Sequence, residues 1–83
     1  MNIESERPTV AVASVSFSAN EPLIAELSAI GVNVVRNAGG HRFKTEGALA
    51  KFIGSAECVV VGLEPVGKEV MAACPNLEIV AKC

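Results

Sequence analysis

Short uncharged runs alternate along this chain with segments whose apolar residues are spaced as on one face of a helix. The first run covers residues 9–15 and holds only small or β-branched side chains, which is typical of a strand buried on both faces of a parallel sheet. A polar segment rich in residues that begin helices follows at residues 16–22. The pattern therefore predicts that the chain opens a βαβ unit.

Three helices are predicted between the uncharged runs. The first has Asn20 as its N-cap and ends at Gly31, which supplies a left-handed residue. Its buried stripe is expected at Leu23, Leu27 and Ile30. The second follows the N-cap Thr45 and stops at Gly54, and the third starts from the N-cap Gly67.

Three further uncharged or mainly apolar runs predict the remaining strands, at residues 32–36, 58–62 and 77–83. Strands that alternate with helices across short loops favour a doubly wound parallel sheet, with right-handed crossovers and strand order 2-1-3-4. The handedness places the first helix on one face and the other two on the opposite face. Strands 3 and 4 should then have no covering helix on one face, and strand 4 should form an apolar edge of the sheet. We therefore expect the chain to be part of a larger domain.

Composition limits the class of protein. The chain has 83 residues, 51% of them apolar, and a net charge of -2, which fits one folded domain and argues against a disordered tail or a basic nucleic-acid-binding module. No apolar run is long enough to cross a bilayer. Residues 1–7 form a polar lead without the apolar stretch of a signal peptide, so we expect a cytoplasmic protein with its folded part at residues 8–83.

The three cysteines, Cys58, Cys74 and Cys83, are odd in number and lack Cys-x-x-Cys spacing. Neither a disulfide framework nor a zinc site fits this pattern. We interpret all three as packing thiols, because each lies in or beside an apolar run.

Three stretches resemble the D-isomer-specific 2-hydroxyacid dehydrogenases, closest to the phosphoglycerate-dehydrogenase-like branch. Residues 75–83 (PNLEIVAKC) resemble the family's "P-N-L-K-x-I-A-x-x" strand. Residues 38–42 resemble its "N-P-x-G-R-x-L" loop, and residues 60–70 resemble "V-V-G-x-x-P-I-T-x-E-V-L". The resemblance covers residues 8–83 and implies the N-terminal portion of a flavodoxin-like substrate domain. In full-length members a Rossmann domain that binds NAD interrupts this domain, and a C-terminal segment completes it.

The resemblance also implies what the chain contributes. A full-length relative moves a hydride between a 2-hydroxy acid and nicotinamide, using catalytic residues and a Gly-x-Gly-x-x-Gly loop that lie beyond the stretches matched here. We therefore expect no catalytic residue, no bound NAD and no metal site in this chain by itself. The expected partner is the remainder of the polypeptide with its Rossmann domain, in a homodimer when full-length, and neither nucleic acid nor a membrane is expected.

The resemblance places substrate at the C-terminal ends of the strands. The substrate-cleft candidates are Ser16, Phe17, Gly62, Leu63 and Glu64. Phosphoglycerate-oxidising relatives often carry an arginine in the loop after strand 3, whereas residues 62–64 contain no cation. This departure argues against a phosphorylated substrate.

Simpler interpretations stay open beside these. Phe17 could pack against the first helix instead of walling the cleft, and Glu64 could be an ordinary turn residue ahead of Pro65. We interpret His41 as a solvated loop residue, and Arg42 as a surface charge in preference to an anion-binding group. For the whole chain, the alternative is a free-standing flavodoxin-like interaction or small-ligand-binding module without catalysis.

Overall fold

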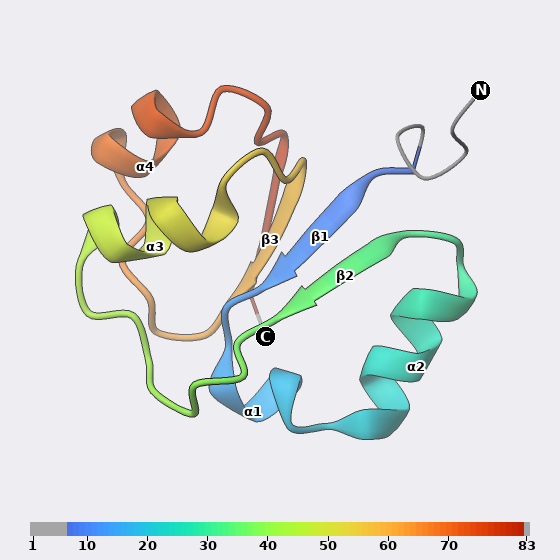
Figure 1. Cartoon of the computed structure of the whole chain (residues 1–83). Helices are drawn as coiled ribbons and strands as arrows, with labels where there is room; N and C mark the ends of the chain where they lie inside the picture. Colours follow the sequence, from blue (N-terminus) through green and yellow to red (C-terminus); the bar gives the residue numbers. More distant parts are fainter. Residues whose placement is uncertain (1–6, 83) are drawn as a thin grey trace.

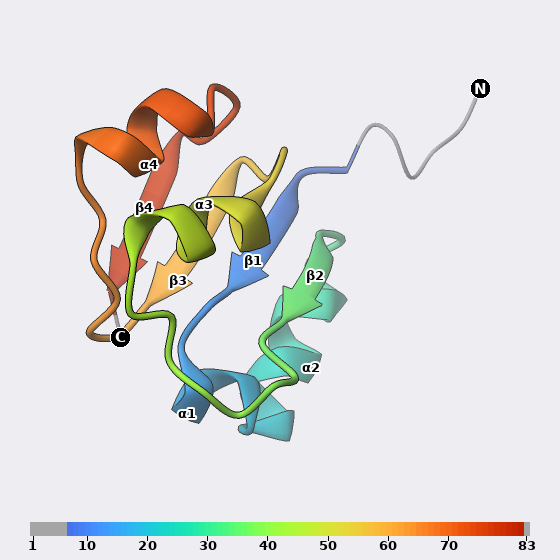
Figure 2. The same ribbon diagram turned by 60° about the vertical axis from the view of Figure 1, so that its left-hand side comes forward.

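The computed structural model describes residues 7–82, which form one parallel sheet with helices on both faces. Its strands are β1 (Thr9–Val12), β2 (Asn33–Arg36), β3 (Cys58–Val61) and β4 (Ile79–Lys82). They lie in the order β2-β1-β3-β4, and each neighbouring pair is parallel (Figures 1 and 2). The predicted strand order is confirmed, and the sheet corresponds to an incomplete flavodoxin-like fold. The predictions for residues 1–6 and Cys83 lie outside the described residues.

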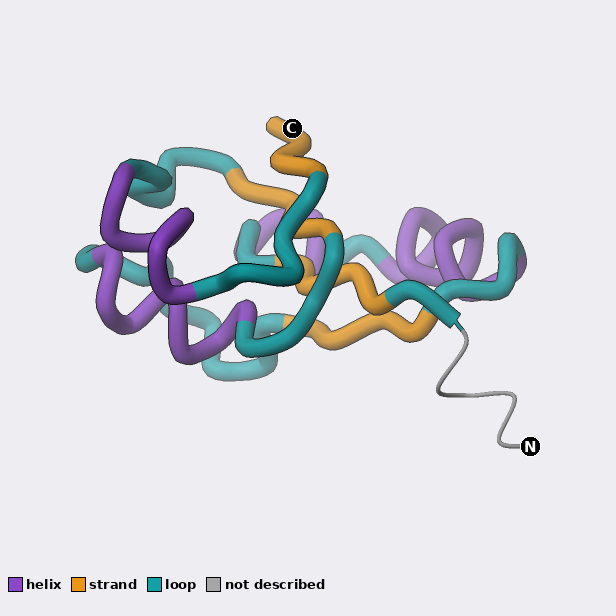
Figure 3. Tube along the Cα trace, turned by 90° about the horizontal axis from the view of Figure 1, so that it is seen from above, coloured by secondary structure: helices purple, strands orange, loops and turns teal. Residues whose placement is uncertain are grey.

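The helices take the faces that right-handed crossovers require. They are α1 (Val15–Ser18), α2 (Glu21–Ala29), α3 (Glu46–Ile53) and α4 (Lys68–Ala73). Figures 2 and 3 show α2 on one side of the sheet, with α3 and α4 together on the other. The sheet is therefore covered by a pair of helices on one face and mainly by α2 on the other.

The predicted helix boundaries agree with the structure. Asn20 and Thr45 each accept a hydrogen bond from the backbone N–H three residues further on, as N-cap residues do. Gly31 and Gly54 both have positive φ angles, of 89° and 55°. A residue with a side chain adopts that conformation only with strain, so glycine ends these helices well.

The start of α4 depends on a neighbouring helix. Gly67 has no side chain with which to cap α4, and Glu46 of α3 takes this role through its Oε1, which accepts a hydrogen bond from Val70 N at 3.2 Å. A Cβ atom at Gly67 would lie 2.9 Å from that oxygen. Glycine thus gives the carboxylate room to approach, and the contact holds α3 against α4.

The first strand is shorter than predicted. The run at residues 9–15 was expected to be one strand, but β1 ends at Val12 and the chain turns into α1. Ser14 causes this turn, because its N–H bonds to Val60 O at 3.2 Å while its Oγ accepts from Phe17 N at 3.3 Å. The hydroxyl caps a short helix that an uncharged run does not reveal.

The buried stripe of α2 also differs from the prediction. Ile24 is the buried residue of α2, Leu23 and Leu27 are partly buried, and Ile30 is 73% exposed. Ile30 is the C-cap residue, with ψ near 2°, so it lies past the last helical residue. The helix lies over the β1–β2 side of the sheet (Figure 1), and only the middle of the stripe reaches strand side chains.

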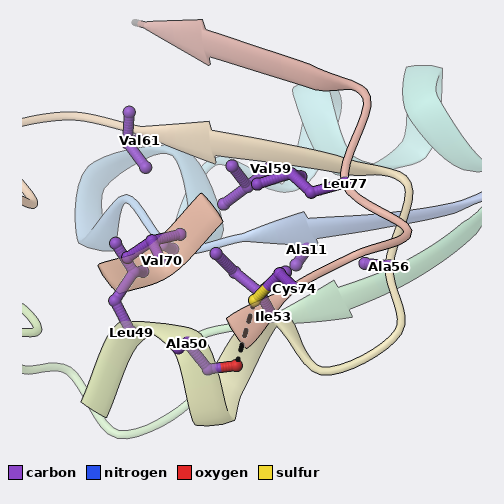
Figure 4. Packing of buried hydrophobic residues seen from close by; sticks show 11 residues of the cluster. Ala11, Leu49, Ala50, Ile53, Ala56, Val59, Val61, Val70, Cys74 and Leu77 are labelled. Atoms are coloured by element: carbon purple, nitrogen blue, oxygen red, sulfur yellow. Dashed lines mark hydrogen bonds between the residues drawn. The ribbon is translucent and has the colours of Figure 1, made fainter. Parts of the chain in front are cut away.

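Two unequal cores flank the sheet. The core beneath α3 and α4 contains Ala11, Ala13, Leu49, Ala50, Ile53, Ala56, Val59, Val61, Val70, Cys74 and Leu77 (Figure 4). Cys74 Sγ donates to Ala50 O at 3.6 Å, which fixes the thiol among these side chains. Within residues 7–82, the core beneath α2 has four buried members, Val10, Val12, Ile24 and Val60.

The sheet is open near β4 on the face of α2, as predicted. Residues paired across neighbouring strands point to the same face, so Ile79, paired with Cys58, points to the side of α2. Ile79 is 58% exposed. Val80 pairs with the buried Val59 and points to the α3–α4 side. Ile79 is therefore the exposed apolar side chain of β4 on the open face.

Val60→Asp should abolish folding, because it places a charge in the core beneath α2, among the apolar side chains of Val10, Val12 and Ile24. Thermal unfolding followed by circular dichroism should show no cooperative transition. Val35→Asp is the matched control, since Val35 is a strand residue that is 43% exposed. A cooperative melt for Val60→Asp would show that β3 is not central to stability.

Ile79→Lys should reduce self-association of the 83-residue chain, because the open face and the edge of β4 expose apolar surface. Sedimentation velocity should show a larger monomer fraction than for the wild type. Ile30→Lys makes the same change at an exposed residue at the end of α2, which lies over β1 and β2 and away from β4, and should leave the distribution unchanged. A wild type that is monomeric at high concentration contradicts this prediction.

Candidate functional site

The sheet has a topological switch point between β1 and β3. After β1 the chain crosses to β2 on one side, and after β2 it crosses back over β1 to β3 on the other side. The two connections therefore diverge at the C-terminal ends of β1 and β3. Open α/β sheets bind ligands in the crevice that forms at such a place.

A pocket of about 370 Å³ lies at this switch point. Its lining residues are Ser14, Val15, Ser16, Ala19, Arg42, Gly62, Leu63 and Glu64. They come from the segment after β1, the segment after β3, and the loop between β2 and α3. Three segments that are distant in sequence thus supply one small site.

Four of the five substrate-cleft candidates line this pocket, namely Ser16, Gly62, Leu63 and Glu64. Leu63 is 81% exposed and stands at the rim. Phe17 does not line the pocket; it is partly buried against the core beneath α2. The geometry favours the packing interpretation of Phe17 that the sequence left open.

Glu64 is a buried acid in the wall of the pocket. It is 7% exposed, and its Oε1 accepts a hydrogen bond from Gly62 N at 2.6 Å. That bond closes the turn after β3 in the way that acidic turn residues do. Glu64 therefore serves as a turn residue and as a wall of the pocket.

Two serine hydroxyls lie opposite the acid. Ser14 Oγ and Ser16 Oγ are 3.3 Å apart and share a hydrogen bond. A Cβ atom at Gly62 would lie 3.7 Å from Ser14 Oγ and 3.7 Å from Glu64 Oε1. The hydroxyls and the carboxyl group thus converge around the bare backbone of Gly62.

Arg42 brings the positive charge of the pocket. It is exposed, and it comes from the loop after β2. Arg42 was expected to be a surface charge, since a linear sequence does not show that this loop reaches the ends of β1 and β3. The neighbouring His41 is exposed and lines neither pocket; its backbone O accepts from Asn37 Nδ2 at 2.8 Å.

A second cavity of about 350 Å³ lies at the ends of β1 and β2, and its polar groups are occupied by structural bonds. Ser18 Oγ donates to Val12 O at 3.0 Å and accepts from Asn37 N at 3.1 Å. Asn37 Nδ2 donates to Ala13 O and to His41 O. This network holds the loop after β2 against β1, so we interpret it as support for the loop that carries Arg42.

Arg36 closes the side of the second cavity. Its guanidinium donates to Ser18 O and forms an ion pair with Glu21 at 2.7 Å. The hydrogen bond and the charge of Arg36 lower the pKa of the exposed Glu21 carboxyl group. The guanidinium group of Arg36 is thus occupied by bonds within the fold. Arg42 is the arginine that lines the switch-point pocket.

The described thiols suit packing roles. Burial raises the pKa of both Cys58 and Cys74, so the thiols are protonated at neutral pH. Within residues 7–82 no cluster of three His, Cys, Asp or Glu side chains could hold a metal ion. Cys83 lies outside this part of the chain.

No protein-family profile, curated protein or solved structure matches this chain. In the part of the chain that the structure describes, no helix has the length and apolar character needed to cross a membrane. The geometry of the switch-point pocket is therefore the observation from which function is inferred.

Asn37→Ala should lower the free energy of unfolding by about 1–3 kcal/mol, because it leaves the buried Ala13 O without its donor and releases the loop after β2. Urea denaturation measures the loss. Asn76→Ala is the control, since Asn76 is exposed and its single bond to Ser55 O is 3.4 Å long. Equal small losses in the two variants would show that the Asn37 network is dispensable.

Proposed function

We propose that this chain is the N-terminal part of the substrate domain of an NAD-dependent D-2-hydroxyacid dehydrogenase, and that it holds the 2-hydroxy acid in the switch-point pocket. The observation that carries the proposal is the convergence of Ser16, Gly62, Glu64 and Arg42 on one small cavity at the C-terminal ends of β1 and β3. That edge is where doubly wound sheets bind their ligands.

The chemistry of the pocket suits a small hydroxy acid. A guanidinium group pairs well with a carboxylate, so Arg42 is the group that attracts the acid end of the ligand. The serine hydroxyls and the Glu64 carboxyl group can accept a hydrogen bond from an alcohol. The volume of about 370 Å³ is at the small end of ligand sites, which favours a short carbon chain.

Binding and orientation are the proposed tasks of this chain. Hydride transfer between C2 of the acid and nicotinamide needs a bound NAD and an acid–base pair, and His41, the single histidine of the sequence, lies outside the pocket. In the proposal a Rossmann domain of the full-length cytoplasmic protein, a homodimer, supplies these groups. Its remainder also covers the open face at Ile79.

The second candidate is a flavodoxin-like module that binds a small ligand or a protein without catalysis. The observation that favours it is the open apolar face at β4, which a partner protein could cover as well as further segments of the same polypeptide. The two candidates predict different ligands, because a module without catalysis is not expected to bind 2-hydroxy acids in preference to other small molecules.

Titration of the chain with D-glycerate should shift the backbone amide NMR signals of Ser16 and Gly62. Arg42→Gln should weaken this binding by about 5- to 10-fold, because it removes a charge-assisted hydrogen bond to the carboxylate. Lys51→Gln removes an exposed cation of α3 that does not line the pocket and should leave the affinity unchanged.

Calorimetry should detect no NAD binding to this chain alone, and an absorbance assay should detect no hydride transfer. Micromolar NAD affinity contradicts this assignment of roles. If D-glycerate shifts no pocket signal, the substrate-domain proposal is wrong and the binding-module candidate takes its place.

A further inference from the structure

One oxygen of the Glu64 carboxyl group has no hydrogen-bond partner among the described residues. Oε1 is held by Gly62 N at 2.6 Å, and within residues 7–82 the carboxyl group makes no other hydrogen bond or ion pair. No fully buried side-chain oxygen in this part of the chain is left without a hydrogen bond. Oε2 is therefore not sealed inside the protein, and the pocket that Glu64 lines is the route by which a ligand would reach it.

An acid with so little exposure normally has strong partners. Glu64 is 7% exposed, and transfer of a carboxylate out of water is unfavourable unless donors or a cation replace the lost hydration. A single backbone N–H compensates for only part of this loss. A hydrogen-bond donor on a ligand in the pocket can supply the rest.

The pocket is lined by one basic and one acidic side chain, and the two come from different segments of the chain. Arg42 comes from the loop after β2, while Glu64 comes from the turn after β3. A ligand with one carboxylate and one hydroxyl can satisfy both groups at once. A phosphate or a second carboxylate at the hydroxyl position would instead meet Oε2, an acceptor of the same charge.

We propose that Glu64 determines the specificity of this site, so that the pocket accepts 2-hydroxy acids whose other end is a free hydroxyl and rejects those in which that end is phosphorylated. Glu64 accepts a hydrogen bond from the hydroxyl through Oε2, and Arg42 pairs with the carboxylate. This inference rests on the proposed function and names the substrate class of the same site.

The test compares D-glycerate with 3-phospho-D-glycerate, which differ only by the phosphate. NMR titration of the wild-type chain should show D-glycerate binding at least 10-fold more tightly. Glu64→Gln should reduce this preference at least 10-fold, because glutamine keeps an acceptor for Gly62 N while its amide replaces Oε2 with a donor that a phosphate can use.

Glu26→Gln is the matched control, since Glu26 is exposed on α2 and lines neither cavity. It should leave the preference unchanged. Thermal melting establishes whether Glu64→Gln folds, and the wild-type comparison is decisive even where that variant does not fold.

Binding of 3-phospho-D-glycerate as tight as that of D-glycerate in the wild type overturns the inference. So does a preference that survives Glu64→Gln. In both cases the proposed function stands, because a 2-hydroxy acid still occupies the pocket. Absence of binding by either acid overturns the proposed function and this inference together.

Discussion

The burial of β1 on both faces is the constraint on which the rest of the structure depends. Ala11 points to the core beneath α3 and α4, and Val12 points to the core beneath α2; both are fully buried. A strand in that position needs a neighbour on each side and a helix on each face. Right-handed crossovers then send β2 to one side and β3 to the other, and the crevice at the ends of β1 and β3 follows from this arrangement.

The residues of the candidate site are those that meet at this crevice. Because β1 ends at Val12 and the chain turns at Ser14, the hydroxyls of Ser14 and Ser16 lie near the turn after β3, where Gly62 leaves room for the Glu64 carboxyl group. The Asn37 network holds the loop after β2 close enough for Arg42 to join them. The site therefore depends on hydrogen bonds that also stabilise the fold.

The uneven cover of the sheet is a second consequence of the same topology. Two helices fall on one face and α2 with its short companion α1 on the other, so the core on the α2 side is small and Ile79 is left in solvent. An apolar side chain on an open strand face is unfavourable in water. The proposed function would explain the exposed apolar side chain on this face, because a larger domain would use the face as an internal packing surface.

The sequence by itself determined the order of the elements, the strand order and most helix boundaries. These depend on local features such as uncharged runs, the N-caps Asn20 and Thr45, and Gly31 and Gly54, together with the handedness of crossovers. It also named four residues of the pocket, because strand ends can be located along the chain. Only the tertiary structure decided that Ser14 turns β1 into α1, that Ile24 and not Ile30 is buried, and that Arg42 joins Glu64. The turn at Ser14 is held by its bond to Val60 O, the burial of Ile24 by the side chains of β1 and β3, and the place of Arg42 by the bonds of Asn37. These contacts join segments that are remote in sequence, and no local pattern encodes them.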